Sequence, residues 1–286
     1  MSNEENMSYK LYHGDCLEVM KELEEHSVDL ILADLPYGTT DRSSKSGSRV
    51  FEWDSPIPAD QLWVEYKRVL KKNGVVVLTA DQPFTSALVM SNLDWFKYEW
   101  IWKKSRTTGF FHANYRPMKS TEDILVFSEG GAAAASKNSA RGNMTYNPQG
   151  LIEKRVKKKN SRKRLGKHFP EKFVGKNNKG LGELKDEEGN VIREASEYEQ
   201  KWTNYPTEIL EFAIESTTKH PTQKPVALME YLILTYSNEG EVVLDNVMGS
   251  GTTGIAAANT NRIFIGIEKN DEYFSIAKER IEAANQ

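Results

Sequence analysis

The chain reads Val28-Asp29-Leu30-Ile31-Leu32-Ala33-Asp34-Leu35-Pro36-Tyr37-Gly38 close to its N-terminus. Residues 28–33 are mostly apolar and stop at a Pro/Gly turn, which is the pattern of a buried strand in a parallel sheet. Open α/β sheets bind ligands at the carboxyl ends of such strands. Here Asp34 offers a charged acceptor and Tyr37 a flat face, and the ring of Pro36 leaves nearby carbonyls free to accept hydrogen bonds. The stretch suits a planar base with an exocyclic amine, and it equally suits a strand end followed by a tight turn.

Apolar runs elsewhere predict the rest of one sheet. We expect seven strands, near residues 10, 31, 77, 99, 125, 243 and 265, with helices between them. Two of them, at 95–104 and 123–127, follow each other without a long helical connection and are expected to form an edge that contains antiparallel pairs. Seven strands with interleaved helices predict a doubly wound α/β fold.

A second informative stretch is Val242-Val243-Leu244-Asp245-Asn246-Val247-Met248-Gly249-Ser250-Gly251-Thr252-Thr253. Its glycines follow a strand and open a helix, where the backbone can approach a ligand and the helix N-terminus favours an anion. Glu268 ends the next strand, where a carboxylate can accept both hydroxyls of a ribose. A dinucleotide oxidoreductase is the rival interpretation, but no hydride-transfer constellation accompanies the glycines.

Together the two stretches resemble the amino-group DNA methyltransferases, which use S-adenosylmethionine and carry (Asp/Asn/Ser)-Pro-Pro-Tyr and Asp-Pro-Phe-x-Gly-Ser-Gly-Thr motifs. The catalytic motif comes first here, as in the circularly permuted beta class. Leu35 replaces the first Pro, and residues 246–248 replace Pro-Phe-x. The resemblance implies a seven-stranded, Rossmann-like methyltransferase fold, and it covers the chain outside roughly 130–206.

The resemblance also implies a set of site residues. Asp34 and a backbone carbonyl near Leu35 or Pro36 would accept hydrogen bonds from the target amine, and Tyr37 would stack on the flipped-out base. Asp15 would bind the adenine of the cofactor, Glu268 its ribose and Lys224 its methionine carboxylate. No metal is expected. The full predicted cofactor site comprises Asp15, Cys16, His220, Gln223, Lys224, Asp245, Gly249, Ser250, Gly251, Thr252 and Glu268.

Asp at the first motif position favours the N6 amine of adenine in double-stranded DNA as the methyl acceptor. A cytosine-N4 methyltransferase and a catalytically inactive DNA-binding relative are the alternatives. A homodimer and a cognate restriction endonuclease remain open as further partners.

Charge divides the chain unevenly. The net charge is −3, but residues 154–179 hold twelve Lys/Arg and one acid, a net of +11, which leaves −14 for the remainder. We therefore expect residues 1–129 and 207–286 to form the catalytic domain and residues 130–206 an inserted target-recognition region that meets a polyanion. A disordered linker is the alternative for the insertion. The segment Ser105–Phe111 also mixes basic and aromatic residues, and it fits either a DNA contact or a structural loop.

Cys16 is the only cysteine, which excludes an internal disulfide and fits a reducing cytoplasm. No run of about 18 apolar residues is present, so the sequence predicts no membrane span.

Overall fold

The computed structural model describes residues 8–38, 55–134, 140–159, 184–185, 191–193, 197–215 and 223–286. The chain divides into two compact units: Met1–Asn147 with Thr207–Gln286, and Pro148–Pro206. In the described part of the chain, no helix is both long and apolar enough to cross a membrane.

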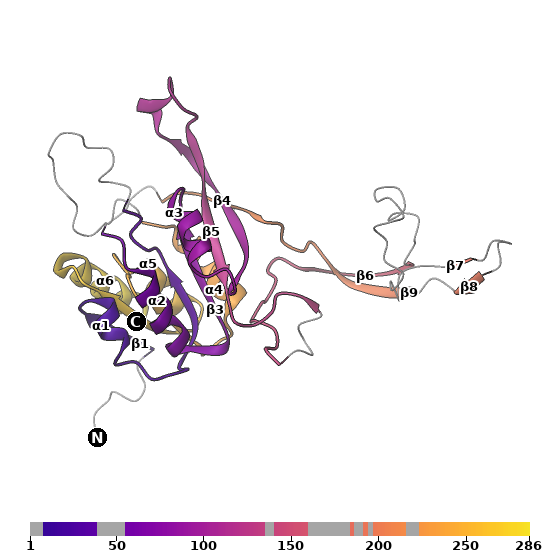
Figure 1. Ribbon diagram of the computed structural model, residues 1–286, viewed down its shortest axis with the longest axis horizontal. Helices are drawn as coiled ribbons and strands as arrows, with labels where there is room; N and C mark the ends of the chain where they lie inside the picture. Colours follow the sequence, from indigo (N-terminus) through magenta and orange to yellow (C-terminus); the bar gives the residue numbers. More distant parts are fainter. Residues whose placement is uncertain are drawn as a thin grey trace. The chain divides into compact units, whose positions relative to one another are not determined.

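The first unit is built on one eight-stranded sheet with the order β1-β12-β11-β2-β3-β5-β4-β10 (Figure 1). The strands β3 and β5 and the strands β5 and β4 pair antiparallel, as expected for that edge, and the other pairs are parallel. The strands are β1 Tyr9–His13, β2 Val28–Ala33, β3 Leu70–Ala80, β4 Phe96–Thr108, β5 Lys119–Phe127, β10 Ile209–Phe212, β11 Val242–Asp245 and β12 Ile263–Glu268.

All seven predicted strands are present, and the predicted doubly wound α/β architecture is confirmed. The eighth strand, β10, was not predicted. It pairs parallel with the outer edge of β4, from Ile209 beside Ile101 to Phe212 beside Lys104.

Helices cover both faces of the sheet because successive strand residues point to opposite sides. Leu30 and Leu32 of β2 pack in one core with α4, α5 and α6, whereas Ile31 and Ala33 pack in a second core with α1, α2 and α3. This arrangement is the doubly wound one. The helices are α1 Cys16–Met20, α2 Ala59–Val69, α3 Phe84–Ser91, α4 Val226–Tyr236, α5 Thr252–Asn259 and α6 Asp271–Ala284.

The strands β4 and β5 continue beyond the rest of the sheet as a two-stranded ribbon (Figure 1). A short 3-10 helix, η4, Phe110–His112, lies at the tip of this ribbon. Its base is the part of the ribbon that packs into the core, where Trp100, Trp102, Ile124 and Val126 are buried.

The first unit holds the chain at both places where the second unit begins and ends. The backbone N–H of Asn147 donates to Thr235 O at 2.7 Å, and its side-chain amide donates to Ser237 O at 3.1 Å. The returning chain forms β10. The predicted insertion, 130–206, therefore overlaps both units, because residues up to Asn147 belong to the first one.

Two antiparallel pairs make up the described part of the second unit. The strand β6, Ile152–Lys159, pairs with β9, Glu197–Thr203, and β7, Leu184–Lys185, pairs with β8, Val191–Arg193. Basic residues of β6 lie opposite acidic residues of β9, with Lys157 beside Glu199. The rest of the predicted basic segment, residues 160–179, lies outside the described residues.

Candidate functional site

A cavity of about 970 Å³ opens at the carboxyl edge of the parallel strands. It is lined at one end by the turn after β2 and at the other by the glycine turn after β11. The predicted site residues that line it are Asp15, Cys16, Asp34, Leu35, Pro36, Tyr37, Gln223, Lys224, Asp245, Gly249, Ser250, Thr252 and Glu268.

Asp34 follows β2 directly and is held by three donors. Its Oδ1 accepts from the Tyr37 hydroxyl at 2.9 Å and from the Thr79 hydroxyl, and its Oδ2 lies 2.6 Å from Lys224 Nζ. Lys224 is 7% exposed, so this ion pair is largely removed from water. Burial opposes the charge of Lys224, but the carboxylates of Asp34 and Glu122 raise its pKa. The pair therefore holds Asp34 as an oriented carboxylate at the cavity wall.

Glu122 of β5 is a second carboxylate at this site, which the sequence analysis missed, and unlike Asp34 it is buried. Its Oε1 lies 3.0 Å from Lys224 Nζ, and its Oε2 lies 2.6 Å from Lys104 Nζ of β4. Burial would raise the pKa of Glu122, but the two ammonium groups lower it to about 2. Two carboxylates and two ammonium groups thus form a balanced chain of charges, Asp34–Lys224–Glu122–Lys104, which we call the buried charge network.

Tyr37 belongs to the same network. Its hydroxyl also lies 3.0 Å from Glu122 Oε1, and burial raises its pKa well above the ordinary value. The ring stacks on Phe84 of α3 with centroids 5.2 Å apart. The structure adds a contact that the sequence analysis did not predict: the hydroxyl of Tyr37 is directed to Asp34 and Glu122. The Tyr37 side chain therefore helps to orient the Asp34 carboxylate and also offers a ring.

Leu35 shows why the first Pro of the family motif can be replaced here. Its side chain is 3% exposed and packs in the core that contains Cys16 and Met20. Leu35 and Pro36 both line the cavity, so their backbone lies beside Asp34. The replacement of the first Pro by Leu therefore leaves this stretch of backbone at the cavity wall.

The glycine turn lies at the other end of the cavity. Gly249 has φ of +51°, and an added Cβ would meet little there, so the backbone leaves open space toward the cavity. Its N–H donates to Glu268 Oε2 at 2.9 Å, and the N–H of Asn270 donates to Glu268 Oε1 at 2.7 Å. A carboxylate has about four acceptor positions. Glu268 is thus fixed by the backbone and keeps acceptor capacity for a ligand.

Three further predicted residues lie at this edge, Asp15 and Cys16 at the start of α1 and Asp245 at the end of β11. Asp15 caps α1 through the N–H of Leu17 at 3.0 Å and lies 3.2 Å from Lys269 Nζ. Burial raises the pKa of the Cys16 thiol. Burial also raises the pKa of Asp245 to about 7, although hydrogen bonds from Thr253 and from the N–H of Val247 act to lower it.

The remaining predicted residues fall in three places. Ser250 donates to Gln223 Oε1 at 3.2 Å and joins the turn to the segment before α4. Gly251 does not line the cavity; with φ of +83° it forms the N-cap of α5 and packs against α6. His220 lies outside the described residues.

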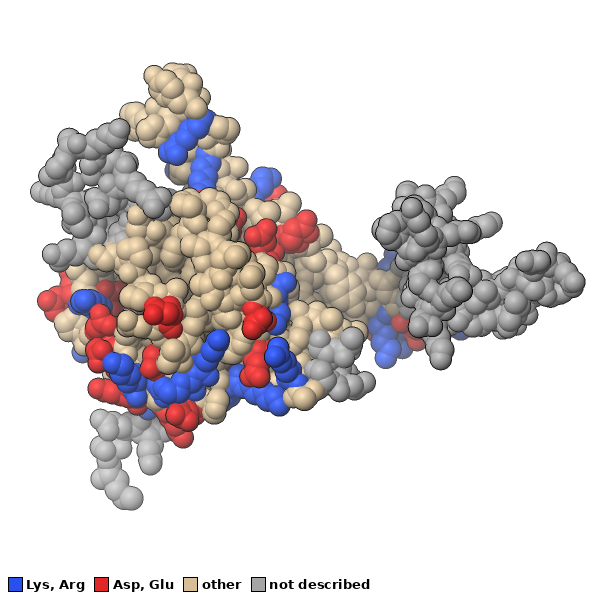
Figure 2. Space-filling view, viewed as in Figure 1, with Lys and Arg blue, Asp and Glu red and all other residues tan. Residues whose placement is uncertain are grey.

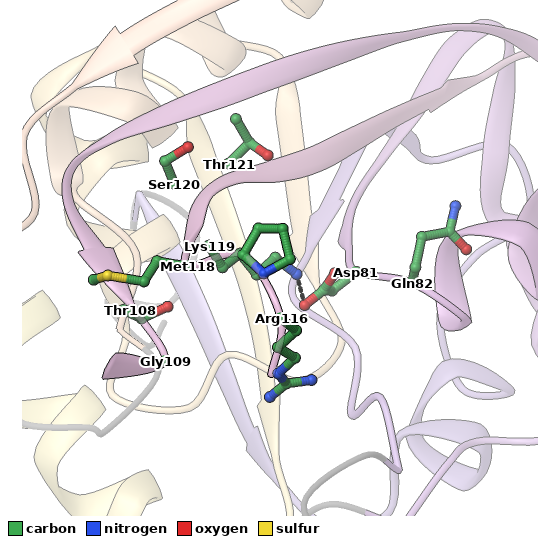
Figure 3. A pocket seen from close by; sticks show the side chains of 10 residues that line it. Asp81, Gln82, Thr108, Gly109, Arg116, Met118, Lys119, Ser120 and Thr121 are labelled. Carbon is green, nitrogen blue, oxygen red and sulfur yellow. Dashed lines mark ion pairs between the residues drawn. The ribbon is translucent and has the colours of Figure 1, made fainter. Parts of the chain in front are cut away.

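A smaller cavity of about 400 Å³ adjoins the large one and shares Asp81 and Thr108 with it (Figure 3). It lies between the start of α3 and the β4–β5 ribbon. Lys119 forms an ion pair with Asp81 across it, and the guanidinium of Arg116 is directed away from this pair (Figure 3).

Comparisons with known proteins agree with this geometry. A family model described as DNA methylase, for N6 and N4 methyltransferases, matches residues 28–279. The chain is 30% identical over 288 residues to the DNA adenine methyltransferase YhdJ of Escherichia coli (strain K12), with 98% of this chain and 85% of that protein covered. It is 28% identical over 292 residues to the type II methyltransferase M2.DpnII of Streptococcus pneumoniae, with 96% of this chain and 90% of that protein covered.

A solved structure is similar along almost the whole chain. The crystal structure of the M1.HpyAVI–SAM complex has a TM-score of 0.56 and 25% identity, with 96% of this chain and 98% of that chain covered. Since the family model covers most of the sequence and includes both motifs, the chain belongs to the family of amino-group (N6/N4) DNA methylases.

Proposed function

We propose that the protein methylates the N6 amine of adenine in double-stranded DNA, with S-adenosylmethionine as the methyl donor. The observation that carries this proposal is the shared cavity, in which the oriented Asp34 carboxylate faces the same space as the glycine turn. The adenine named for the relative YhdJ supports the choice of base. Cytosine N4 is the alternative acceptor, because the family model covers both amines.

The glycine-turn end suits S-adenosylmethionine. Glu268 and Asp15 supply acceptors for the ribose hydroxyls and the adenine amine, and the turn that opens α5 supplies backbone N–H groups for a carboxylate. Asp245 and the backbone of Gly249 complete this wall. When bound, S-adenosylmethionine supplies a methyl group already activated by the sulfonium.

The amine of adenine is a poor nucleophile because its lone pair is delocalised into the ring. Asp34 and a carbonyl of Leu35 or Pro36 would accept its two N–H groups, which directs the lone pair toward the methyl group and stabilises the charge that develops on nitrogen. Lys224 is a positioning residue in this scheme: it fixes Oδ2 of Asp34, and Glu122 fixes Lys224. This role differs from the methionine-carboxylate contact expected from the sequence.

Two further parts of the proposal concern organisation. The parallel pairing of the last strand, β12, with the first, β1, supports a circular permutation, since Gly14 N donates to Glu268 O at 3.0 Å. The second unit, Pro148–Pro206, is the proposed target-recognition region, on the basis of its basic sequence.

Expression in a bacterial host without DNA methylation, followed by long-read detection of modified bases, tests the activity. We expect N6-methyladenine in one sequence context. N4-methylcytosine as the only product would refute the choice of base, and unmodified DNA would refute the activity.

Asp34→Asn provides the matched catalytic test. Loss of one preorganised transition-state contact typically costs about a hundredfold to a thousandfold in rate. We expect that loss in single-turnover methylation, while calorimetry shows S-adenosylmethionine binding unchanged. Near wild-type turnover would remove Asp34 from the mechanism.

A further inference from the structure

The tip of the β4–β5 ribbon is an ordered element in its own right. Gly109 has φ of +90°, which starts the turn, and η4 follows it. Backbone N–H groups of His112 and Tyr115 donate to Gly109 O and His112 O at 2.9 Å each. Because the tip satisfies these groups itself, its side chains are free to face outward.

Those side chains are aromatic and exposed. Phe110 is 76% exposed, Phe111 95% and Tyr115 88%. Three large rings in water at one tip lack the stabilisation that burial would give each of them. Contiguous exposed apolar surface of this kind marks a contact site.

The charge around the tip indicates the partner. Residues 103–121 contain five Lys/Arg and no Asp or Glu. Lys103, Lys104 and Lys119 are paired with acids elsewhere in the fold. Figure 2 shows Lys and Arg on the stem of this ribbon and no acid on the visible face of its tip.

Two positively charged side chains of this ribbon are available to bind a partner. Arg106 and Arg116 form no ion pair or side-chain hydrogen bond with any other residue described by the structure. Unpaired guanidinium groups beside exposed rings are complementary to phosphates beside stacked bases.

The ribbon also lies next to the cavity that contains Asp34. Thr108, at the end of β4, lines both the catalytic cavity and the smaller one of Figure 3. Three residues of chain span at most about 11 Å, so Phe111 lies within that distance of the cavity wall. A two-stranded ribbon is also of a size that the major groove, about 12 Å wide, admits.

We propose that the β4–β5 tip is the element that opens the duplex: Phe111, supported by Phe110, enters the base stack where the target base leaves it, and Arg116 binds a flanking phosphate. The inference rests on the proposed function, since it assigns the step that brings the base to Asp34. An apolar wedge inserted at a base step lowers the net cost of unstacking.

Single-turnover methylation of two duplexes tests the wedge, one with the target base paired and one with it opposite an abasic site. We expect Phe111→Ala to slow methylation of the paired duplex about tenfold to a hundredfold, the size typical of losing one base-stacking ring. On the abasic duplex its rate should come within about threefold of wild type, because an unpaired base costs least to extrude. Phe111→Leu keeps an apolar wedge and should retain most of the activity on both. Met90→Ala, which truncates an exposed apolar side chain of α3, is the control and should change neither rate.

The outcomes separate the wedge from its rivals. Equal losses of methylation rate on both duplexes would refute the wedge and would indicate that the tip only contacts DNA. Dissociation of a dimer by Phe111→Ala in sedimentation, with equal losses on both duplexes, would make it a subunit contact. Unchanged rates for Phe111→Ala, with an active wild type, would refute the wedge alone, whereas an inactive wild type would refute the proposed function.

Discussion

Replacing Glu122 by Gln removes one negative charge from the buried charge network and keeps the shape of the side chain. Glu122 is 6% exposed and stands between Lys224 and Lys104. Without its charge, Lys104 would lose its carboxylate partner, and Lys224 would keep only that of Asp34. Breaking a buried pair by removing one partner typically costs about 3–5 kcal/mol.

The pKa of Glu122 gives a second route to the magnitude. Burial acts to raise this pKa, but Lys224 and Lys104 lower it from 4.5 to about 2. That difference corresponds to roughly 3 kcal/mol of stability at neutral pH. Since the folded-state pKa is the lower one, this stabilisation is complete above pH 4.5 and is lost as the pH falls toward 2.

Urea denaturation at several pH values is the assay. We expect Glu122→Gln to lower the free energy of unfolding by about 3 kcal/mol at about pH 7, and we expect the difference from wild type to shrink below about pH 4.5. Glu211→Gln is the matched control, because Glu211 forms an exposed ion pair with Lys103 on the same sheet edge. Such exposed pairs contribute at most about 1 kcal/mol. A Glu122→Gln variant as stable as wild type at neutral pH, or a difference independent of pH, would refute the account of the network.

Three other predictions concern the cofactor wall, the glycine turn and the basic segment. Glu268→Ala should weaken S-adenosylmethionine binding in calorimetry by about 1.5–3 kcal/mol, the worth of a hydrogen bond to a charged group; unchanged affinity would mean that the cofactor lies elsewhere. Gly251→Val should lower the melting temperature sharply, because its φ is +83° and an added Cβ would lie 3.0 Å from α6, whereas Gly240→Ala, with φ of +78° and open space, should cost less; equal losses would contradict the packing argument. Neutralising residues 157–159 and 162–164 should weaken binding to all duplexes alike and flatten its salt dependence by about 0.9 for each phosphate that is no longer neutralised; a changed methylation motif would instead show that the segment reads bases.

Local sequence was enough to predict the strand at 28–33 and the acid-bearing turn after it, because a buried strand and a Pro/Gly turn leave their pattern in consecutive residues. The same holds for the glycine turn that opens α5. The strand β10 has only four residues, of which Leu210 alone is buried, and it forms because β4 offers an unpaired edge. The sequence of residues 209–212 contains no pattern that predicts pairing with that edge.

The buried charge network could not be predicted for a related reason. Lys104 and Glu122 stand in sequence contexts that also suit the solvent-exposed face of a strand, and only the antiparallel pairing of β4 with β5 brings them together. Lys224 reaches them from a segment far along the chain. The sequence therefore identifies Asp34 and Tyr37 but not the groups that orient them.

The anchoring of Asn147 on α4 and of β10 on β4 has an evolutionary consequence. Both ends of the second unit are held by bonds between residues of the first unit, and these bonds involve no residue between 148 and 206. Mutations in that segment can therefore accumulate, and whole segments can be exchanged between homologues, while the sheet and its cavity keep their geometry. Selection can act on the two parts of the chain separately, so under the proposed role of the second unit a change of DNA target need not bring a loss of chemistry.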